Sequence, residues 1–91
     1  MLKIKDGFIL RQVAGNYIVI GVGGDAVNFN GMVTINETGA FLWQILEKGA
    51  NKEDLLEALL KEYDVDEESA KQDITAFLTN LYNGELLDIN E

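Results

Sequence analysis

The chain has 91 residues, contains no histidine or cysteine, and carries a formal net charge of −9. This length suits one domain over residues 1–91, and a hydrophobic content of 47% argues against disorder. Without cysteine or histidine, the chain lacks disulfide bonds, thiolate and imidazole metal ligands, and the commonest catalytic bases and nucleophiles. We find no apolar stretch that suits a signal peptide or could span a bilayer, so we expect a cytoplasmic protein.

The negative charge is concentrated in the second half of the chain. Residues 1–45 carry three basic and three acidic side chains, whereas residues 46–91 carry four lysines and thirteen carboxylates. Such a surface repels phosphate backbones and anionic lipid, so neither nucleic acid nor a membrane is an expected partner. A solvated face that keeps the protein soluble explains the charge more simply than a dedicated electrostatic role does.

The first third of the chain reads as β-strands. Residues 8–13 and 17–20 are rich in β-branched and aromatic side chains and are separated by a turn signal, which predicts a hairpin. Residues 26–29 and 32–35 flank Asn30-Gly31, a pair that favours a tight type I′ turn. We therefore expect a small antiparallel meander whose last regular strand is 32–35.

Three helices are predicted after the strands. Asn36 is a good N-cap and Gly49 a good stop for the first helix, which is apolar on nearly every face and should be buried. The second helix follows Asn51, and the third begins near Asp66 and ends at Gly84. Residues 85–89 are compatible with a short closing strand. The expected fold class is α+β, a three-stranded antiparallel sheet followed by three helices.

Candidates for chemistry are few. The carboxylate pairs among residues 64–68 sit at a polar helix start, where acidic side chains are favoured by the helix dipole, and the segment lacks the glycine of a calcium loop. We therefore predict no catalytic residue and no metal site, and we do not expect an enzyme.

One glycine-rich segment matches a cofactor pattern. Residues 21–26, with the sequence GVGGDA, satisfy the dinucleotide-binding pattern G-x-G-x-x-G/A and follow a strand. That pattern works by opening a helix whose N-terminus binds pyrophosphate, whereas residues 27–31 read as strand and turn. We therefore expect a glycine-rich hairpin connection and no cofactor.

The strand at 32–35 is a candidate binding edge. A meander leaves strand edges with unpaired backbone groups, and this run has no charge or proline to protect it. It could accept a strand from a partner, or it could be covered by residues 85–89. The sequence leaves both hypotheses open.

The segment from Ile35 to Trp43, INETGAFLW, resembles the strand-to-helix junction of the PqqD family. The likeness extends to the second helix, to the Tyr63-Asp64-Val65 bridge and to the end of the third helix. It implies a winged-helix-like β-β-β-α-α-α domain that binds the leader of a ribosomally made precursor peptide and presents it to a modifying enzyme, such as a radical SAM protein. Gly39, where alanine is usual, and the glycine-rich insert 21–31 depart from the family, so synthesis of pyrroloquinoline quinone itself is not implied.

The resemblance also implies a site, in which the leader adds as a strand beside the third strand and next to the third helix. The implied peptide-binding residues are Met32, Val33, Thr34, Ile35, Ala70, Asp73, Phe77, Asn80 and Leu81. Two other functions are left open: a winged-helix DNA-binding regulator, although its third helix would offer Lys71 against four acidic residues, and a protein-interaction scaffold. A homodimer is also left open.

Overall fold

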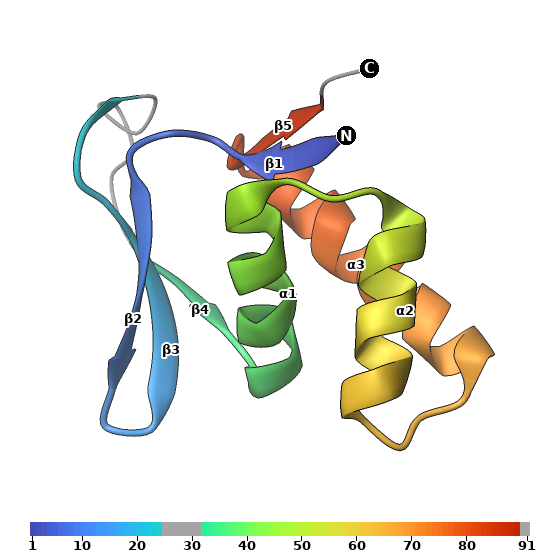
Figure 1. Ribbon diagram of the computed structural model, residues 1–91. Coiled ribbons are helices and arrows are strands. Elements are labelled where there is room, and N and C mark those ends of the chain that lie inside the picture. Colours follow the sequence, from blue (N-terminus) through green and yellow to red (C-terminus); the bar gives the residue numbers. More distant parts are fainter. Residues whose placement is uncertain (25–31, 90–91) are drawn as a thin grey trace.

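A computed structural model describes residues 1–24 and 32–89, apart from the side chain of Met32. Figure 1 shows a small sheet on one side of the molecule and three helices on the other. In chain order the elements are β1 (Leu2–Ile4), β2 (Phe8–Val13), β3 (Asn16–Gly21), β4 (Met32–Ile35), α1 (Glu37–Lys48), α2 (Lys52–Glu62), α3 (Glu67–Asn83) and β5 (Leu87–Ile89). The α+β class predicted from the sequence is confirmed.

The predicted meander is present as an antiparallel sheet in the order β2-β3-β4. Ala14 and Gly15 form a two-residue loop between β2 and β3, and both have positive φ angles, 52° and 83°. These angles are typical of the turns that match the twist of a hairpin. The strand predicted at 26–29 and the turn at Asn30-Gly31 lie outside the described residues.

A second sheet, not expected from the sequence, joins the two ends of the chain. β1 pairs with β5 in antiparallel register, and Leu2 also exchanges backbone hydrogen bonds of 2.7 and 2.8 Å with Ala50. The predicted order, a three-stranded sheet followed by three helices, therefore omits two strands. β1 precedes the meander and β5 follows the helices. Three-residue strands are too short for an alternating pattern to stand out in the sequence.

The pairing of β5 decides one of the open hypotheses. Residues 85–89 do contain a strand, but it lies on β1 and not on β4. The hypothesis that this segment covers the edge of β4 is therefore wrong. Within the described residues, β4 pairs only with β3.

The helices begin where the sequence predicts. The Asn36 side chain accepts a hydrogen bond of 2.7 Å from the Gly39 amide, and Asp66 accepts one of 3.4 Å from the Ser69 amide. At the start of α2, the Asn51 amide donates to the Asp54 carboxylate at 3.0 Å. These bonds satisfy amide groups that have no partner inside the helix or its first turn.

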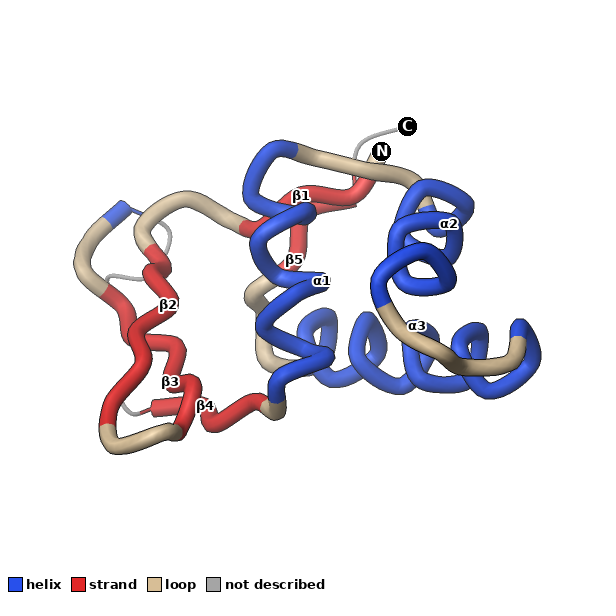
Figure 2. Tube along the Cα trace, turned by 60° about the horizontal axis from the view of Figure 1, so that its bottom comes forward, coloured by secondary structure: helices blue, strands red, loops and turns tan. Residues whose placement is uncertain are grey.

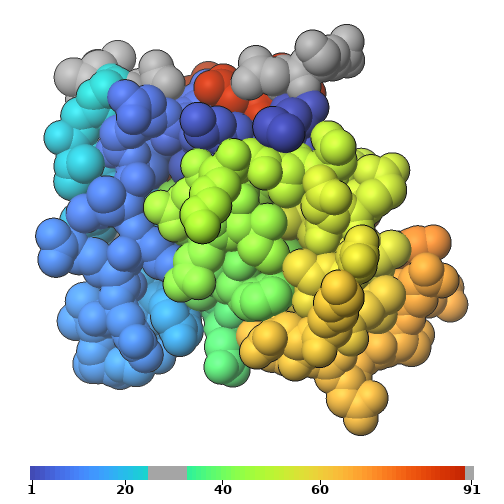
Figure 3. Space-filling model, viewed as in Figure 1, coloured from blue at the N-terminus to red at the C-terminus, as the bar shows by residue number. Residues whose placement is uncertain are grey.

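The core forms around α1, which lies between the β2-β3-β4 sheet and the other two helices (Figure 2). Its Leu42, Trp43 and Leu46 are at most 1% exposed. They belong to one cluster with buried side chains of every other element except β4, whose Val33 and Ile35 pack against it half-buried. The side chains of α1 and α2 form a continuous surface in Figure 3. Among the described residues, no helix has the length and hydropathy needed to cross a membrane.

The glycine-rich segment after β3 folds back onto the start of β2. The Val22 amide donates to the Gly7 carbonyl at 2.7 Å, and a Cβ atom on Gly7 would collide with the Gly23 carbonyl. Gly7 also has a φ of 94°, so this close approach requires glycine. Val22 thus extends the hairpin by one pair and Gly23 packs on Gly7, while Asp25 and Ala26 lie outside the described residues.

Candidate functional site: a groove between β4 and α3

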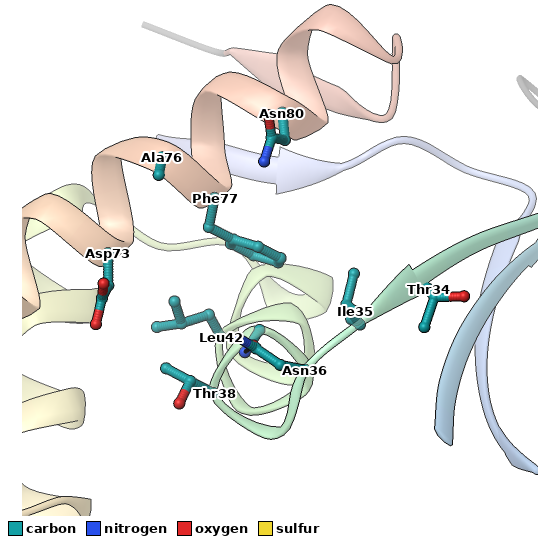
Figure 4. A pocket seen from close by; sticks show the side chains of 10 residues that line it. Thr34, Ile35, Asn36, Thr38, Leu42, Asp73, Ala76, Phe77 and Asn80 are labelled. Atoms are coloured by element: carbon teal, nitrogen blue, oxygen red, sulfur yellow. Dashed lines mark hydrogen bonds between the residues drawn. The ribbon is translucent and has the colours of Figure 1, made fainter.

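An open groove of about 310 Å³ separates β4 and the start of α1 from one face of α3. Figure 4 shows this groove with α3 on one side and β4 on the other. Its lining residues are Thr34, Ile35, Asn36, Thr38, Gly39, Leu42, Asp73, Ala76, Phe77 and Asn80. They come from a strand, its helical continuation and a distant helix, so the groove exists only in the folded chain.

The floor of the groove is apolar. Leu42 is 1% exposed, while Ile35 and Phe77 are half-buried against the core. Figure 4 shows the Phe77 ring reaching from α3 toward Ile35 and α1. An apolar floor of this kind offers a place for one apolar side chain of a ligand.

The rim of the groove is polar. Thr34, Asn36, Asp73 and Asn80 are exposed, and Asp73 is the one charged side chain among the ten lining residues. Asp73 and Asn80 mark the two ends of the α3 segment that borders the groove (Figure 4). A ligand therefore meets hydrogen-bonding groups around an apolar centre, and a negative charge at one end.

The direction of the backbone groups in β4 follows from the hairpin before it. A two-residue loop closes on a hydrogen-bonded pair, here Val13 and Asn16. Such pairs alternate along an antiparallel ladder, and the bond from Val22 to Gly7 continues the same alternation beyond the strands. The amide and carbonyl groups of Asn16, Ile18 and Ile20 are therefore directed toward β2.

The other residues of β3 must then bond to β4. Tyr17 faces Ile35 and Val19 faces Val33, so these are the hydrogen-bonded pairs of the second ladder. By the same alternation, the amide and carbonyl groups of Met32 and Thr34 are directed away from β3. Since no strand among the described residues lies on that side, these groups form a free edge next to the groove.

The structure distributes the nine residues implied by the sequence resemblance over three settings. Thr34, Ile35, Asp73, Phe77 and Asn80 line the groove. Met32 contributes backbone at the free edge, and Val33 packs half-buried against the core. Ala70 and Leu81 are 0% and 2% exposed, so their side chains are core residues that do not line the groove.

Five lining residues were not anticipated: Asn36, Thr38, Gly39, Leu42 and Ala76. For Ala76 a signal was present, since positions 73, 76, 77 and 80 share one helical face, next to the buried face of Ala70, Ile74, Leu78 and Leu81. The residues of α1 could not be assigned without knowing that the start of this helix lies opposite α3.

Nothing in the groove resembles a catalytic or metal centre. Among the described residues, no group of three or more acidic side chains is arranged to hold a metal ion. In the acidic segment between α2 and α3, hydrogen bonds from Ser69 lower the pKa of Asp66 below its ordinary value. Asp66 is thus occupied as the N-cap of α3, as expected for a carboxylate at a helix start.

Comparison with known proteins places the chain in a family. The family model described as coenzyme PQQ synthesis protein D (PqqD) matches residues 9–87. The chain belongs to the PqqD family, as its sequence resemblance indicated. A search of curated proteins found no match.

Two solved structures share the fold over nearly the whole chain. The first, "TbiB1 in Complex with the TbiA(beta) Leader Peptide", is 25% identical with a TM-score of 0.78, and the alignment covers 98% of each chain. The second, "Lasso peptide synthetase B1 complexed with the leader peptide", is 22% identical with a TM-score of 0.75, covering 97% of this chain and 98% of that one. Both are complexes with leader peptides.

Proposed function

We propose that this protein is a non-catalytic module that binds the leader of a ribosomal precursor peptide. The observation that carries the proposal is the free edge of β4, with the backbone groups of Met32 and Thr34 directed outward beside the groove. An extended peptide can add to such an edge through main-chain hydrogen bonds, while alternate side chains enter the groove. Family membership and the leader-bound relatives support this ligand.

The expected affinity follows from the size of the site. Met32 and Thr34 offer four backbone groups, each worth about 1 kcal/mol net when bonded. An apolar side chain on the floor adds about 1.5–3 kcal/mol, and the sum must offset the entropy cost of association. A second anchor would raise the gross gain to about 7–10 kcal/mol, so after an association cost of at least about 4 kcal/mol we expect binding of tens of micromolar or weaker. Such a complex is reversible, which suits delivery of a peptide to an enzyme.

A proline substitution on the free edge tests the mode of binding. Thr34→Pro removes an outward amide without breaking the ladder to β3, whereas Val33→Pro would break that ladder. Gln12→Pro is the matched control, because the same alternation directs the Gln12 amide outward at the opposite edge of the sheet. The probe is the best binder selected from displayed random 12-residue peptides, with affinity measured by calorimetry.

We expect Thr34→Pro to weaken binding at least tenfold while Gln12→Pro leaves it unchanged, with both variants folded by circular dichroism. Equal affinities for the two variants would exclude strand addition at β4. If no peptide is enriched on the wild-type protein, and none encoded beside its gene binds, the proposed function is wrong.

We propose that a modifying enzyme, such as a radical SAM protein, acts on the held peptide in the cytoplasm, and that the helices have a winged-helix-like arrangement. The presence of a short precursor gene and a modifying enzyme gene next to this gene would support the partner. A co-purification of the three proteins, with the enzyme retained only when the peptide is present, tests it directly.

A DNA-binding regulator is the competing function. Residues 67–73 of α3 carry Lys71 against Glu67, Glu68 and Asp73, and Asp73 lies on the groove rim. A recognition helix needs basic side chains for phosphate contacts. Saturable micromolar binding to duplex DNA at low salt would favour the regulator over the peptide-binding module.

A further inference from the structure

We infer that the groove selects a peptide with a lysine or arginine two residues away from an apolar anchor. The inference rests on the proposed function and adds the chemistry of the ligand to it. Its basis is the placement of Asp73, Phe77 and β4, which fixes where a charge and an apolar side chain of a bound strand would lie.

Asp73 supplies the charge at this site. Its side chain is exposed on the groove rim, and no ion pair with it occurs among the described residues. The chain has four lysines in its helical half, and none of them lines the groove. Lys71, two residues earlier, lines a separate depression between α2 and α3. The carboxylate of Asp73 is therefore available for a cation from the ligand.

The start of α1 favours a negative charge on the ligand, opposite to the charge that Asp73 favours. Asn36 and Thr38 at the same rim belong to the N-terminus of this helix, where the helix dipole favours a negative group. Two features reduce that effect: the Asn36 side chain already accepts from the Gly39 amide, and Glu37 lies in the first turn. We therefore expect Asp73 to decide the sign of the ligand's charge.

The spacing follows from the geometry of helix and strand. Asp73 and Phe77 are four residues apart on α3, a rise of about 6 Å along the helix. Two residues of a β-strand span about 6.7 Å, and residues two apart face the same side. Figure 4 shows that the groove-facing side chains from Asp73 to Asn80 follow α3 in the opposite direction to the path from Thr34 at the end of β4 to Thr38 at the start of α1. A strand added to β4 can thus place one side chain at Phe77 and the next on that face at Asp73.

The position of Asp73 also determines which end of the bound peptide carries the cationic residue. Phe77 lies opposite Ile35, the last residue of β4, and Asp73 lies beyond it, near Thr38 in α1 (Figure 4). The cation therefore belongs to the end of the peptide that passes the start of α1. A peptide antiparallel to β4 would have the order cation-x-apolar, and a parallel one would have apolar-x-cation.

The test is a selection from displayed random 12-residue peptides on wild-type protein and two variants. Asp73→Asn removes the rim charge, and Asp64→Asn removes another exposed carboxylate, between α2 and α3 and outside the groove. All cationic peptides gain from the net charge of −9, so the control separates this general attraction from the ion pair.

On the wild-type and Asp64→Asn proteins we expect enrichment of peptides that carry an apolar and a cationic residue with one residue between them. The order should be either cation-x-apolar or apolar-x-cation. On Asp73→Asn the apolar preference should persist while the cationic preference disappears. A selected peptide should bind Asp73→Asn roughly three- to tenfold more weakly, and the difference should shrink at 1 M salt. Asp73→Lys should select acidic residues at the same position.

The outcomes are distinguishable. Enriched peptides that lack a cation at this spacing, or that keep it on Asp73→Asn, would overturn the inference and leave the proposed function intact. An absence of any enriched peptide would instead count against the proposed function itself.

Discussion

The Phe77 ring on α3 lies directly against Gly39 on α1. A Cβ atom on Gly39 would be 3.1 Å from Cε1 of Phe77, 3.1 Å from Oδ1 of the capping Asn36 and 3.3 Å from Cβ of Ile35. Three lining residues of the groove therefore meet at Gly39, which itself lines the groove. The missing methyl group allows Phe77 to sit deep in the groove, where it forms part of the floor.

Gly39→Ala should narrow the groove with little effect on the fold. Alanine is favoured over glycine in a helix by about 0.5–1 kcal/mol, and this gain opposes the cost of moving Phe77 by a few tenths of an ångström. We expect the free energy of unfolding to change by less than about 1 kcal/mol. Affinity for a selected peptide should fall roughly three- to tenfold, as measured by calorimetry.

The double variant Gly39→Ala/Phe77→Leu is the control for this effect. Leucine is shorter than phenylalanine and should leave room for the added methyl group, so the two substitutions should not be additive. If the affinity losses of the single variants simply add, the contact between the two residues does not shape the groove.

Trp43 should be the most sensitive core position of α1. It is 0% exposed, and its Nε1 has no hydrogen-bond partner among the described residues. Trp43→Ala should cost about 3–5 kcal/mol because it leaves a large cavity. Trp43→Phe should cost less than half as much, because phenylalanine leaves a smaller cavity. It also removes the buried indole N–H, whose unmade hydrogen bond destabilises the wild-type protein by about 1–3 kcal/mol.

Chemical denaturation of the two Trp43 variants measures these differences. The wild-type protein has one tryptophan, so its fluorescence should be blue-shifted when folded and move to the hydrated wavelength on unfolding. Native emission at the hydrated wavelength, or equal stability of wild type and Trp43→Ala, would contradict the buried placement.

Asp66, the N-cap of α3, should make the stability of the folded protein depend on pH in the acidic range. Hydrogen bonds from Ser69 lower its folded pKa below 3.8, so the carboxylate stabilises the folded state above the unfolded pKa. This contribution is lost as the pH falls through the folded pKa. Asparagine also caps helices well and does not titrate in this range, so Asp66→Asn should lack this part of the pH dependence.

Thermal unfolding of both proteins between pH 7 and pH 2 provides the measurement. Below about pH 4, the melting temperature of the wild type should fall more steeply than that of Asp66→Asn. Parallel curves for the two proteins would mean that the cap does not contribute to acid sensitivity.

Strand addition should leave a localised signature in solution. On titration with a selected peptide, we expect amide resonances of β4 and of residues 73–80 to shift together, because these segments border the groove. Resonances of α2, which contributes no lining residue, should move little. Shifts concentrated on residues 52–62 would place the peptide in a different site.

Local sequence determined most of the secondary structure. The caps at Asn36, Asn51 and Asp66 were visible because short polar side chains at helix starts satisfy nearby amides, a contact that needs no tertiary partner. The hairpin at Ala14-Gly15 was visible for a similar reason, since its signal lies within a few adjacent residues. The strand pattern also marked 32–35 as a candidate edge, and the family resemblance added the peptide ligand and the residues of α3.

The tertiary structure alone decided which edge is free and what the groove contains. β1 and β5 are short strands from opposite ends of the chain, and their pairing leaves the edge of β4 uncovered among the described residues. Ala70 and Asp73 are three residues apart on one helix, yet one is in the core and the other on the rim. The helical period narrows such assignments, but the packing of α3 against α1 and α2 decides them, because burial depends on contacts between segments far apart in sequence.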